Sequence, residues 1–471
     1  MIRIRIILLL LLFSPLNLNA QTNRFSYSLG SSAGYITPGQ VPFWLRSNQF
    51  GSVPLDNASL SFIGVVHKDY NKSRTRIFDW GASAEGRAYI GDKSNLILIE
   101  GYAKARISIF EIRAGRSKEI TGLCDTSLSC GSFSVSGNAP GIPKAEISIP
   151  EFYSLPFFGR LFAFKGNFSH AWIGKASMNM DSTILRVGTY LHQSSLYGRF
   201  GKPEWKVKLY GGFNHQVLWG NEKESYGPGY AFSPLKTYLY VIRGGTYIDG
   251  NTRLGDHLGS IDLGFEYDFK NFRLLAYRQN LYDAGALYYL ANISDGLNGL
   301  SLVNTNQRPG AFKWKKILVE VFYTKSQGGE SWSVKRPSGA EDYYNHYQYM
   351  QGWSYQGIGI GNPFICQKSF AREGLPSNPY QYFISNRVAA FHFGFEGSVQ
   401  KWDFILKTSY SLNCGTYSTI ETFPDTNQFS AYLDASRELK HGLNIGFTGA
   451  FDVGKLYYNS LGGLVRLGKR F

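Results

Sequence analysis

The chain has few charged residues and four cysteines, and these shortages exclude whole classes of protein. Only 18% of its 471 residues are charged. Coiled coils and helical bundles are rich in Ala, Leu, Glu and Lys, and this chain is not, so those classes are excluded. Aromatic residues reach 16% and there are 53 glycines, which excludes a disordered basic chain. The composition favours an extended, strand-rich protein.

Long apolar runs are also missing after the first twenty residues. Arg3 and Arg5 precede the apolar residues 6–13, and Ala20 offers a small residue for cleavage before Gln21. This pattern is typical of a secretory signal peptide, so we expect residues 1–20 to be removed. No later run reaches about 18 apolar residues, so no transmembrane helix is expected.

Several later segments alternate apolar and polar residues. They cover residues 205–216, 260–269, 401–410 and 443–452. Alternating side chains point to opposite faces of a strand, so each segment has one apolar and one polar face. Each lasts about nine to eleven residues, the length that a tilted strand needs to cross a membrane. A soluble sandwich, the competing interpretation, has strands of about five or six residues.

The last residues strengthen the membrane interpretation. Residues 461–471 alternate in the same way and end on Phe471. A final strand with a terminal aromatic resembles the signal that the barrel assembly machinery of bacterial outer membranes recognises. About 25 residues per strand and connection would give about 16 to 18 strands. We therefore predict an all-β fold, with residues 21–471 forming one antiparallel barrel in the outer membrane of a Gram-negative bacterium and in contact with its lipid.

The connections between the predicted strands differ in length. Tight turns fall at residues 268–271 and 400–401, whereas long connections cover residues 220–259 and 327–379. In such barrels the long loops face outward and the short turns face the periplasm. Residues 279–302 do not alternate cleanly, which predicts a short helix packed in the lumen.

The four cysteines are interpreted as structural residues and not as catalytic ones. In an exported chain, Cys124 and Cys130 are candidates for a local disulfide, which would stabilise the fold by roughly 2 kcal/mol; the alternative is that they are structural free thiols. The pairing of Cys366 with Cys414 stays open. No histidine lies at zinc-ligand spacing from these residues, and no phosphate loop or dinucleotide motif occurs. We expect no metal and no cofactor.

One pair of residues raises the possibility of catalysis. His192 and Ser194 would project from the same face of a strand, a spacing that resembles the outer-membrane phospholipase A family, in which a histidine activates a serine. The sequence shows no supporting acid or Asn, and eight histidines make such a pair easy to obtain by chance. We expect that the protein is not an enzyme.

Charge and aromatic content point to a ligand class. The formal net charge is +15, and a basic rim attracts anionic polymers. Tyrosine and tryptophan suit sugar faces because each joins an apolar surface to a polar tip. The glycan-binding candidates lie in one predicted outer loop: Trp332, Lys335, Arg336, Tyr343, Tyr344, Tyr347 and Trp353. The alternative is that these rings only pack the loop or form a membrane girdle. No nucleic acid partner is expected.

Several short blocks resemble one family. They are residues 131–151, 164–172, 191–199, 212–220, 295–299 and 361–363, and their order and spacing are similar to those of the capsule assembly protein Wzi. The resemblance implies a barrel of about 18 strands, closed by loops outside and by helical segments toward the periplasm. It also implies a lectin that holds capsular polysaccharide on the cell surface. The chain departs from the family after Trp219–Gly220, where a second Gly would be expected.

These observations lead to two functional expectations. The first is a barrel that binds surface or capsular polysaccharide and helps to assemble or retain it. The second is a diffusion channel, or porin, for small or anionic solutes.

Overall fold

The computed structural model describes residues 25–71, 77–92, 94–180, 183–220, 222–230, 233–244, 254–283, 285–306, 310–329 and 341–471. The predicted signal peptide, residues 1–20, lies outside the described residues.

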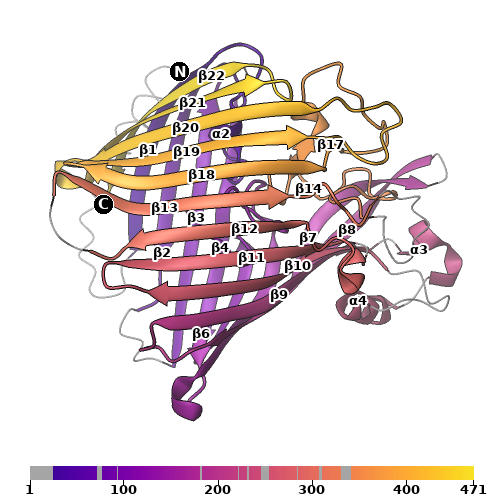
Figure 1. The fold of residues 1–471 in the computed structure, drawn as a ribbon, viewed down its shortest axis with the longest axis horizontal. Coiled ribbons are helices and arrows are strands. Elements are labelled where there is room, and N and C mark those ends of the chain that lie inside the picture. Colours follow the sequence, from indigo (N-terminus) through magenta and orange to yellow (C-terminus); the bar gives the residue numbers. More distant parts are fainter. Residues whose placement is uncertain are drawn as a thin grey trace, which may run out of the picture.

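Eighteen strands form one antiparallel sheet (Figure 1). β1 pairs with both β2 and β22, so the sheet closes on itself as a barrel. The prediction of an all-β barrel of 16 to 18 strands is confirmed. The strands are β1 (Phe25–Ile36), β2 (Ala58–Lys68), β3 (Phe78–Ile90), β4 (Asn95–Ile107), β5 (Phe110–Arg116), β6 (Lys144–Ser154), β7 (Phe162–Met180), β8 (Thr183–Phe200), β9 (Val207–Trp219), β10 (Asp256–Asp268), β11 (Phe272–Tyr282), β12 (Gly296–Asn304), β13 (Phe312–Tyr323), β18 (Val388–Val399), β19 (Trp402–Asn413), β20 (Thr426–Glu438), β21 (Leu443–Gly454) and β22 (Ser460–Arg470).

The alternation seen in the sequence corresponds to the two faces of the barrel wall. In β21, Phe447 and Phe451 are exposed on the outside, whereas Thr448 and Asp452 are buried on the lumen side. The outer wall is therefore apolar and the inner wall polar, as a membrane barrel requires. The five alternating segments of the sequence fall on β9, β10, β19, β21 and β22.

The two ends of the barrel differ. Short connections at residues 108–109, 269–271 and 400–401 lie at the end that also holds the C-terminus, on the left of Figure 1. The long connections leave the other end and cover residues 37–57, 117–143, 220–255 and 324–387. Since short turns face the periplasm in such barrels, the long connections belong to the outer side of the membrane.

The helices in the described residues are few and short. They are α2 (Phe43–Arg46), α3 (Glu222–Tyr226), α4 (Pro234–Arg243) and the 3₁₀ turns η1 (Phe158–Arg160), η2 (Pro228–Tyr230), η3 (Ala286–Tyr289), η4 (Lys368–Phe370) and η5 (Lys440–Gly442). None of the helices in the described part of the chain is long and apolar enough to span a membrane. Two small sheets occur in the connection after β13: β14 (Ser354–Tyr355) with β15 (Ile358–Gly359), and β16 (Cys366–Gln367) with β17 (Phe383–Ser385).

The prediction of a helix in the lumen at residues 279–302 is wrong. This stretch holds the end of β11, the turn η3 at the outer rim, and most of β12. The alternation is weak here because the lumen-facing residues Leu281 and Leu297 are apolar and buried. They contact a hydrophobic core that lies inside the barrel, and the sequence pattern gives no sign of that core.

Candidate functional site

The connection between β5 and β6, residues 117–143, crosses the lumen. Its backbone amides donate to side chains of distant strands: Leu123 to Asp262 of β10 at 2.7 Å, Cys130 to Glu320 of β13 at 2.6 Å and Phe133 to Gln279 of β11 at 3.1 Å. Buried polar groups need such partners, so the inward-facing polar residues of these strands anchor the loop. The loop is therefore hydrogen-bonded to the part of the wall that lies across the lumen from β5 and β6.

The connection between β1 and β2, residues 37–57, also folds inward and carries α2. The amide of Phe43 donates to Asp452 of β21 at 2.7 Å, and the indole of Trp44 donates to Ser409 of β19 at 2.9 Å. Asn48 donates to the carbonyl of Cys130 at 3.0 Å. This loop is thus held both by the wall and by the crossing loop.

Residues 341–387 lie against the crossing loop. The indole of Trp353 donates to the carbonyl of Ser134 at 2.7 Å, and the hydroxyl of Tyr344 donates to the carbonyl of Phe133. In the reverse direction, the hydroxyl of Ser136 donates to the carbonyl of Gly361 at 2.6 Å. We call residues 37–57, 117–143 and 341–387 together the loop layer.

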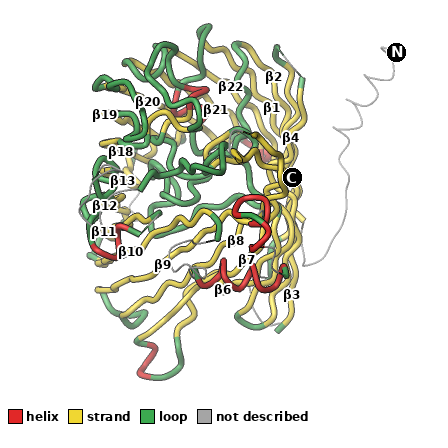
Figure 2. The backbone as a smooth tube through the Cα atoms, turned by 90° about the vertical axis from the view of Figure 1, so that its right-hand side faces the viewer, coloured by secondary structure: helices red, strands yellow, loops and turns green. Residues whose placement is uncertain are grey.

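The loop layer has a hydrophobic core of its own. Phe43, Phe133, Tyr343, Trp353 and Phe383 are essentially fully buried in one cluster with apolar residues of the inner wall. A large apolar side chain contributes roughly 1.5–3 kcal/mol when it is fully buried. Viewed from the right-hand end of Figure 1, the loops run across the interior between the strands (Figure 2). The layer is therefore a packed part of the fold.

The predicted glycan-binding residues fall into three groups. Trp332, Lys335 and Arg336 lie outside the described residues. Tyr343, Tyr344 and Trp353 are buried in the loop layer, where Tyr343 donates to Asp295 at 2.9 Å. These three rings present no surface to a ligand in this structure. Tyr347, by contrast, is 72% exposed.

Exposed tyrosines that the sequence did not single out lie on neighbouring loops. Tyr288 and Tyr289 project from η3, with Tyr288 85% exposed, and Tyr380 is exposed in the third loop of the layer. Glu341 accepts hydrogen bonds from Gly285 at 2.8 Å and Ala286 at 2.6 Å, so it ties η3 to the start of that loop. We call Tyr288, Tyr289, Tyr347 and Tyr380 the outer tyrosines. The sequence carries no signal that separates them from the buried pair Tyr343–Tyr344.

The predicted disulfide is not formed. Cys124 and Cys130 are both buried free thiols, and Cys366 and Cys414 are also free. Of the two alternatives the sequence left open, the structure has the free thiols, and the turn between the two cysteines is held to the inner wall by Tyr277 and Glu320. The amide of Asp125 donates to the hydroxyl of Tyr277 of β11, whereas the amide of Cys130 donates to Glu320 of β13. Among the described residues, no group of three His, Cys, Asp or Glu side chains is arranged to hold a metal ion.

His192 and Ser194 share one face of β8, as their spacing predicts, but that face is the outside of the barrel. The Nδ1 atom of His192 lies 3.2 Å from the hydroxyl of Tyr238 in α4. Its Nε2 atom is buried without a hydrogen-bond partner among the described residues, so it does not engage Ser194. His192 and Ser194 therefore do not form a base and nucleophile pair in this structure.

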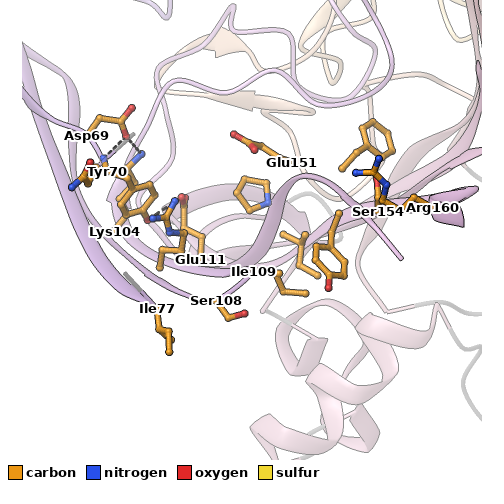
Figure 3. A pocket seen from close by; sticks show the side chains of 16 residues that line it. Asp69, Tyr70, Ile77, Lys104, Ser108, Ile109, Glu111, Glu151, Ser154 and Arg160 are labelled. Carbon is orange, nitrogen blue, oxygen red and sulfur yellow. Dashed lines mark hydrogen bonds and ion pairs between the residues drawn. The ribbon is translucent and has the colours of Figure 1, made fainter. Parts of the chain in front are cut away.

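A cavity of about 870 Å³ lies at the periplasmic end (Figure 3). Charged residues of both signs line it and pair with their neighbours: Lys104 contacts Asp69 at 2.9 Å, and Tyr70 donates to Glu111 at 3.0 Å. Phe152 also lines the cavity, and the ammonium of Lys165 lies 5.1 Å from its ring centroid. This vestibule is lined by both charged and apolar side chains and is open toward the turn end of the barrel.

A closed barrel with an apolar outer wall and a polar lumen is a protein of the bacterial outer membrane, which confirms the predicted location. No protein-family model matches the sequence, and no curated protein matches it.

Several solved structures of outer-membrane proteins are similar to this chain. Wzi of Escherichia coli, described as an outer membrane protein involved in group 1 capsule assembly and a carbohydrate-binding β-barrel, superposes with a TM-score of 0.54 at 11% identity, over 93% of this chain and 83% of that one. OccK5 (OpdH) of Pseudomonas aeruginosa gives 0.47 at 9% identity, over 95% and 98% of the two chains. OccAB2 of Acinetobacter baumannii gives 0.46 at 10% identity, over 95% and 98%.

Proposed function

We propose that this barrel binds a surface polysaccharide, such as a capsule, and helps to assemble or retain it on the cell surface. The observation that carries the proposal is the loop layer. One loop crosses the lumen and bonds to the opposite wall, the two others pack against it, and all three share a buried core. A packed lumen suits a protein that holds a ligand outside the membrane better than one that lets solutes pass.

The outer tyrosines supply the contact surface in this proposal. A tyrosine ring stacks on the apolar face of a sugar while its hydroxyl bonds to the sugar's own hydroxyl groups. One such contact is weak, but a polymer with repeating units engages several at once and gains from their effective concentration. Wzi of Escherichia coli, a carbohydrate-binding barrel of similar fold, and the sequence blocks that resemble its family support the same ligand class.

The test combines conductance with retention of polysaccharide. Purified mature barrel is inserted in planar bilayers, and the same preparation is immobilised and exposed to surface polysaccharide from the cell of origin. The proposal expects a silent barrel that retains the polymer. A steady open-channel current together with no retained polymer would reject it.

A triple variant locates the binding surface. Replacing Tyr288, Tyr289 and Tyr347 by alanine should lower retention at least about tenfold, because stacking contacts of roughly 0.5–1.5 kcal/mol each are lost. The matched control is Tyr27→Ala, since Tyr27 is also exposed but lies near the periplasmic end of β1. Equal retention by the triple variant and the control would move the site away from the outer tyrosines.

The second candidate is a diffusion channel for small or anionic solutes. The periplasmic vestibule favours it, because a cavity of about 870 Å³ lined by charged residues is a plausible end of a solute path. This candidate requires the loop layer to open, and it predicts a current that anionic solutes block.

A further inference from the structure

The helix α4 packs against the outside of the barrel and takes no part in the loop layer. Its first turn is capped by Ser233, whose hydroxyl accepts from the amide of Lys236 at 3.4 Å, and Gly244 ends it with a φ of 58°. Figure 1 shows it beside the ends of β9 and β10, near the outer rim.

The wall beneath α4 belongs to the membrane-facing side. In β9, Leu209 and Phe213 are exposed on the outside, whereas Asn214 and Gln216 are buried in the lumen. Residues two apart share a face, so Val217 and Trp219 continue the outer row. Both are nevertheless buried, because Val241 and Tyr238 of α4 cover them.

Outer aromatic residues of β7 indicate where α4 lies relative to the membrane. Phe168 and Trp172 are exposed on the same outer face, and His170 lies between them. The ring of Tyr238 lies 6.4 Å from that of Phe168 and 5.6 Å from that of His170. Trp172 is level with the start of the neighbouring β6, where Lys144 pairs with Ala171, and with the end of β9, because Tyr190 pairs with both Trp172 and Trp219. Exposed aromatics at the rim of a barrel wall form the girdle at the boundary between hydrocarbon and headgroups. The helix therefore lies at the outer boundary of the membrane.

The side of α4 that faces away from the wall has two edges. Leu235 is 69% exposed and Leu239 is 43% exposed, and a spacing of four places them on one edge. Lys236 and Arg243 are also exposed and form a basic edge beside it. An apolar edge next to a basic edge is the pattern of a helix that lies in a membrane interface.

We propose that α4 is an interfacial helix that inserts Leu235 and Leu239 into the outer leaflet and binds anionic lipid headgroups through Lys236 and Arg243. The occupant is lipid because the apolar edge continues the membrane-facing wall at the aromatic girdle. The two cations match the phosphates of such headgroups in charge.

Spin labels measure the depth of the helix directly. Cys414 is first replaced by serine, since the other three cysteines are buried. A nitroxide is then attached at Leu239→Cys, with Leu263→Cys on the membrane-facing wall and Tyr347→Cys on the outer loop as references. The barrel is reconstituted in vesicles of phosphatidylethanolamine and phosphatidylglycerol. Accessibility to oxygen, which concentrates in hydrocarbon, is divided by accessibility to a water-soluble nickel chelate.

The ratio at Leu239 should exceed that at Tyr347 by about fivefold or more and approach that at Leu263. A ratio equal to that at Tyr347 overturns the proposal. The proposal is also overturned if the label at Leu239 becomes protected only when an envelope protein extract is added, because α4 would then dock a protein.

The basic edge has its own test. The double variant Lys236→Glu, Arg243→Glu should lower the ratio at Leu239 in the anionic vesicles and leave it unchanged in vesicles of phosphatidylcholine. A ratio in anionic vesicles that the double variant leaves unchanged overturns the headgroup contact. Heat-dependent migration of the barrel on gels confirms that each variant has folded.

Discussion

Replacing Glu320 by alanine tests whether the loop layer keeps the barrel closed. Glu320 lies on the lumen side of β13 and is almost fully buried. Its carboxylate accepts from the hydroxyl of Ser129 at 2.7 Å, from the amide of Cys130 at 2.6 Å and from the hydroxyl of Tyr277. Two of these three bonds join the crossing loop to the opposite wall.

The expected effect follows from those two bonds. A hydrogen bond to a charged group contributes about 1.5–3 kcal/mol, and its loss leaves a buried donor without a partner. Losing both bonds therefore weakens the attachment of the loop by at least about 3 kcal/mol. Since about 1.4 kcal/mol corresponds to a factor of ten, the detached state becomes about a hundredfold more populated.

Single-channel recording measures the result. The unmodified barrel should be silent, and Glu320→Ala should show brief openings. The matched control is Glu266→Ala, which removes another carboxylate of the inner wall that bonds Lys208 at 3.1 Å near the periplasmic end. If Glu320→Ala is as silent as the control while its unfolding temperature falls, the loop layer does not close the lumen through this attachment.

Three further predictions concern the outer loops. Burial raises the pKa of Asp342 to about 6, above the usual value of about 3.9. The folded loop therefore binds an extra proton at low pH and loses stability as the pH rises from about 4 to about 7. Gln381 bonds both Asp342 and Thr416, so a nitroxide on the nearby Cys414 should gain mobility over that pH range, and Asp342→Asn should remove the change. Neutralising Lys335 and Arg336 together should weaken polysaccharide retention and its dependence on salt, and unchanged retention would exclude that segment. Trp353→Ala should destabilise the loop layer by about 3–5 kcal/mol through the cavity that it leaves, seen as a lower unfolding temperature, and an unchanged temperature would show that the ring does not support the layer.

Much of the fold was readable from the sequence because strand alternation is a local property. The apolar rows of β9, β10, β19 and β21 face hydrocarbon, and the polar rows face the lumen, so each strand carries its own evidence. The failure at residues 279–302 has a specific cause. Leu281 and Leu297 face the lumen but contact apolar residues of the loop layer, so the polar half of the alternation disappears.

The candidate site was predicted less well for a related reason. Tyr343, Tyr344, Tyr347 and Trp353 are similar as sequence, since all are aromatic residues in a long polar connection. Three of them are buried and one is exposed, and that difference depends on contacts with Phe133 and Ser134 some two hundred positions away in the chain.

The sequence by itself determined that the chain forms an outer-membrane barrel, roughly how many strands it has and which connections are long. These features depend on period, length and composition, which any stretch of chain carries locally. Only the tertiary structure decided that three loops interlock inside the lumen, that the outer tyrosines are the exposed rings and that α4 lies on the membrane-facing wall. Each of these depends on pairs of residues far apart in the chain, which are brought together only when the sheet closes on itself.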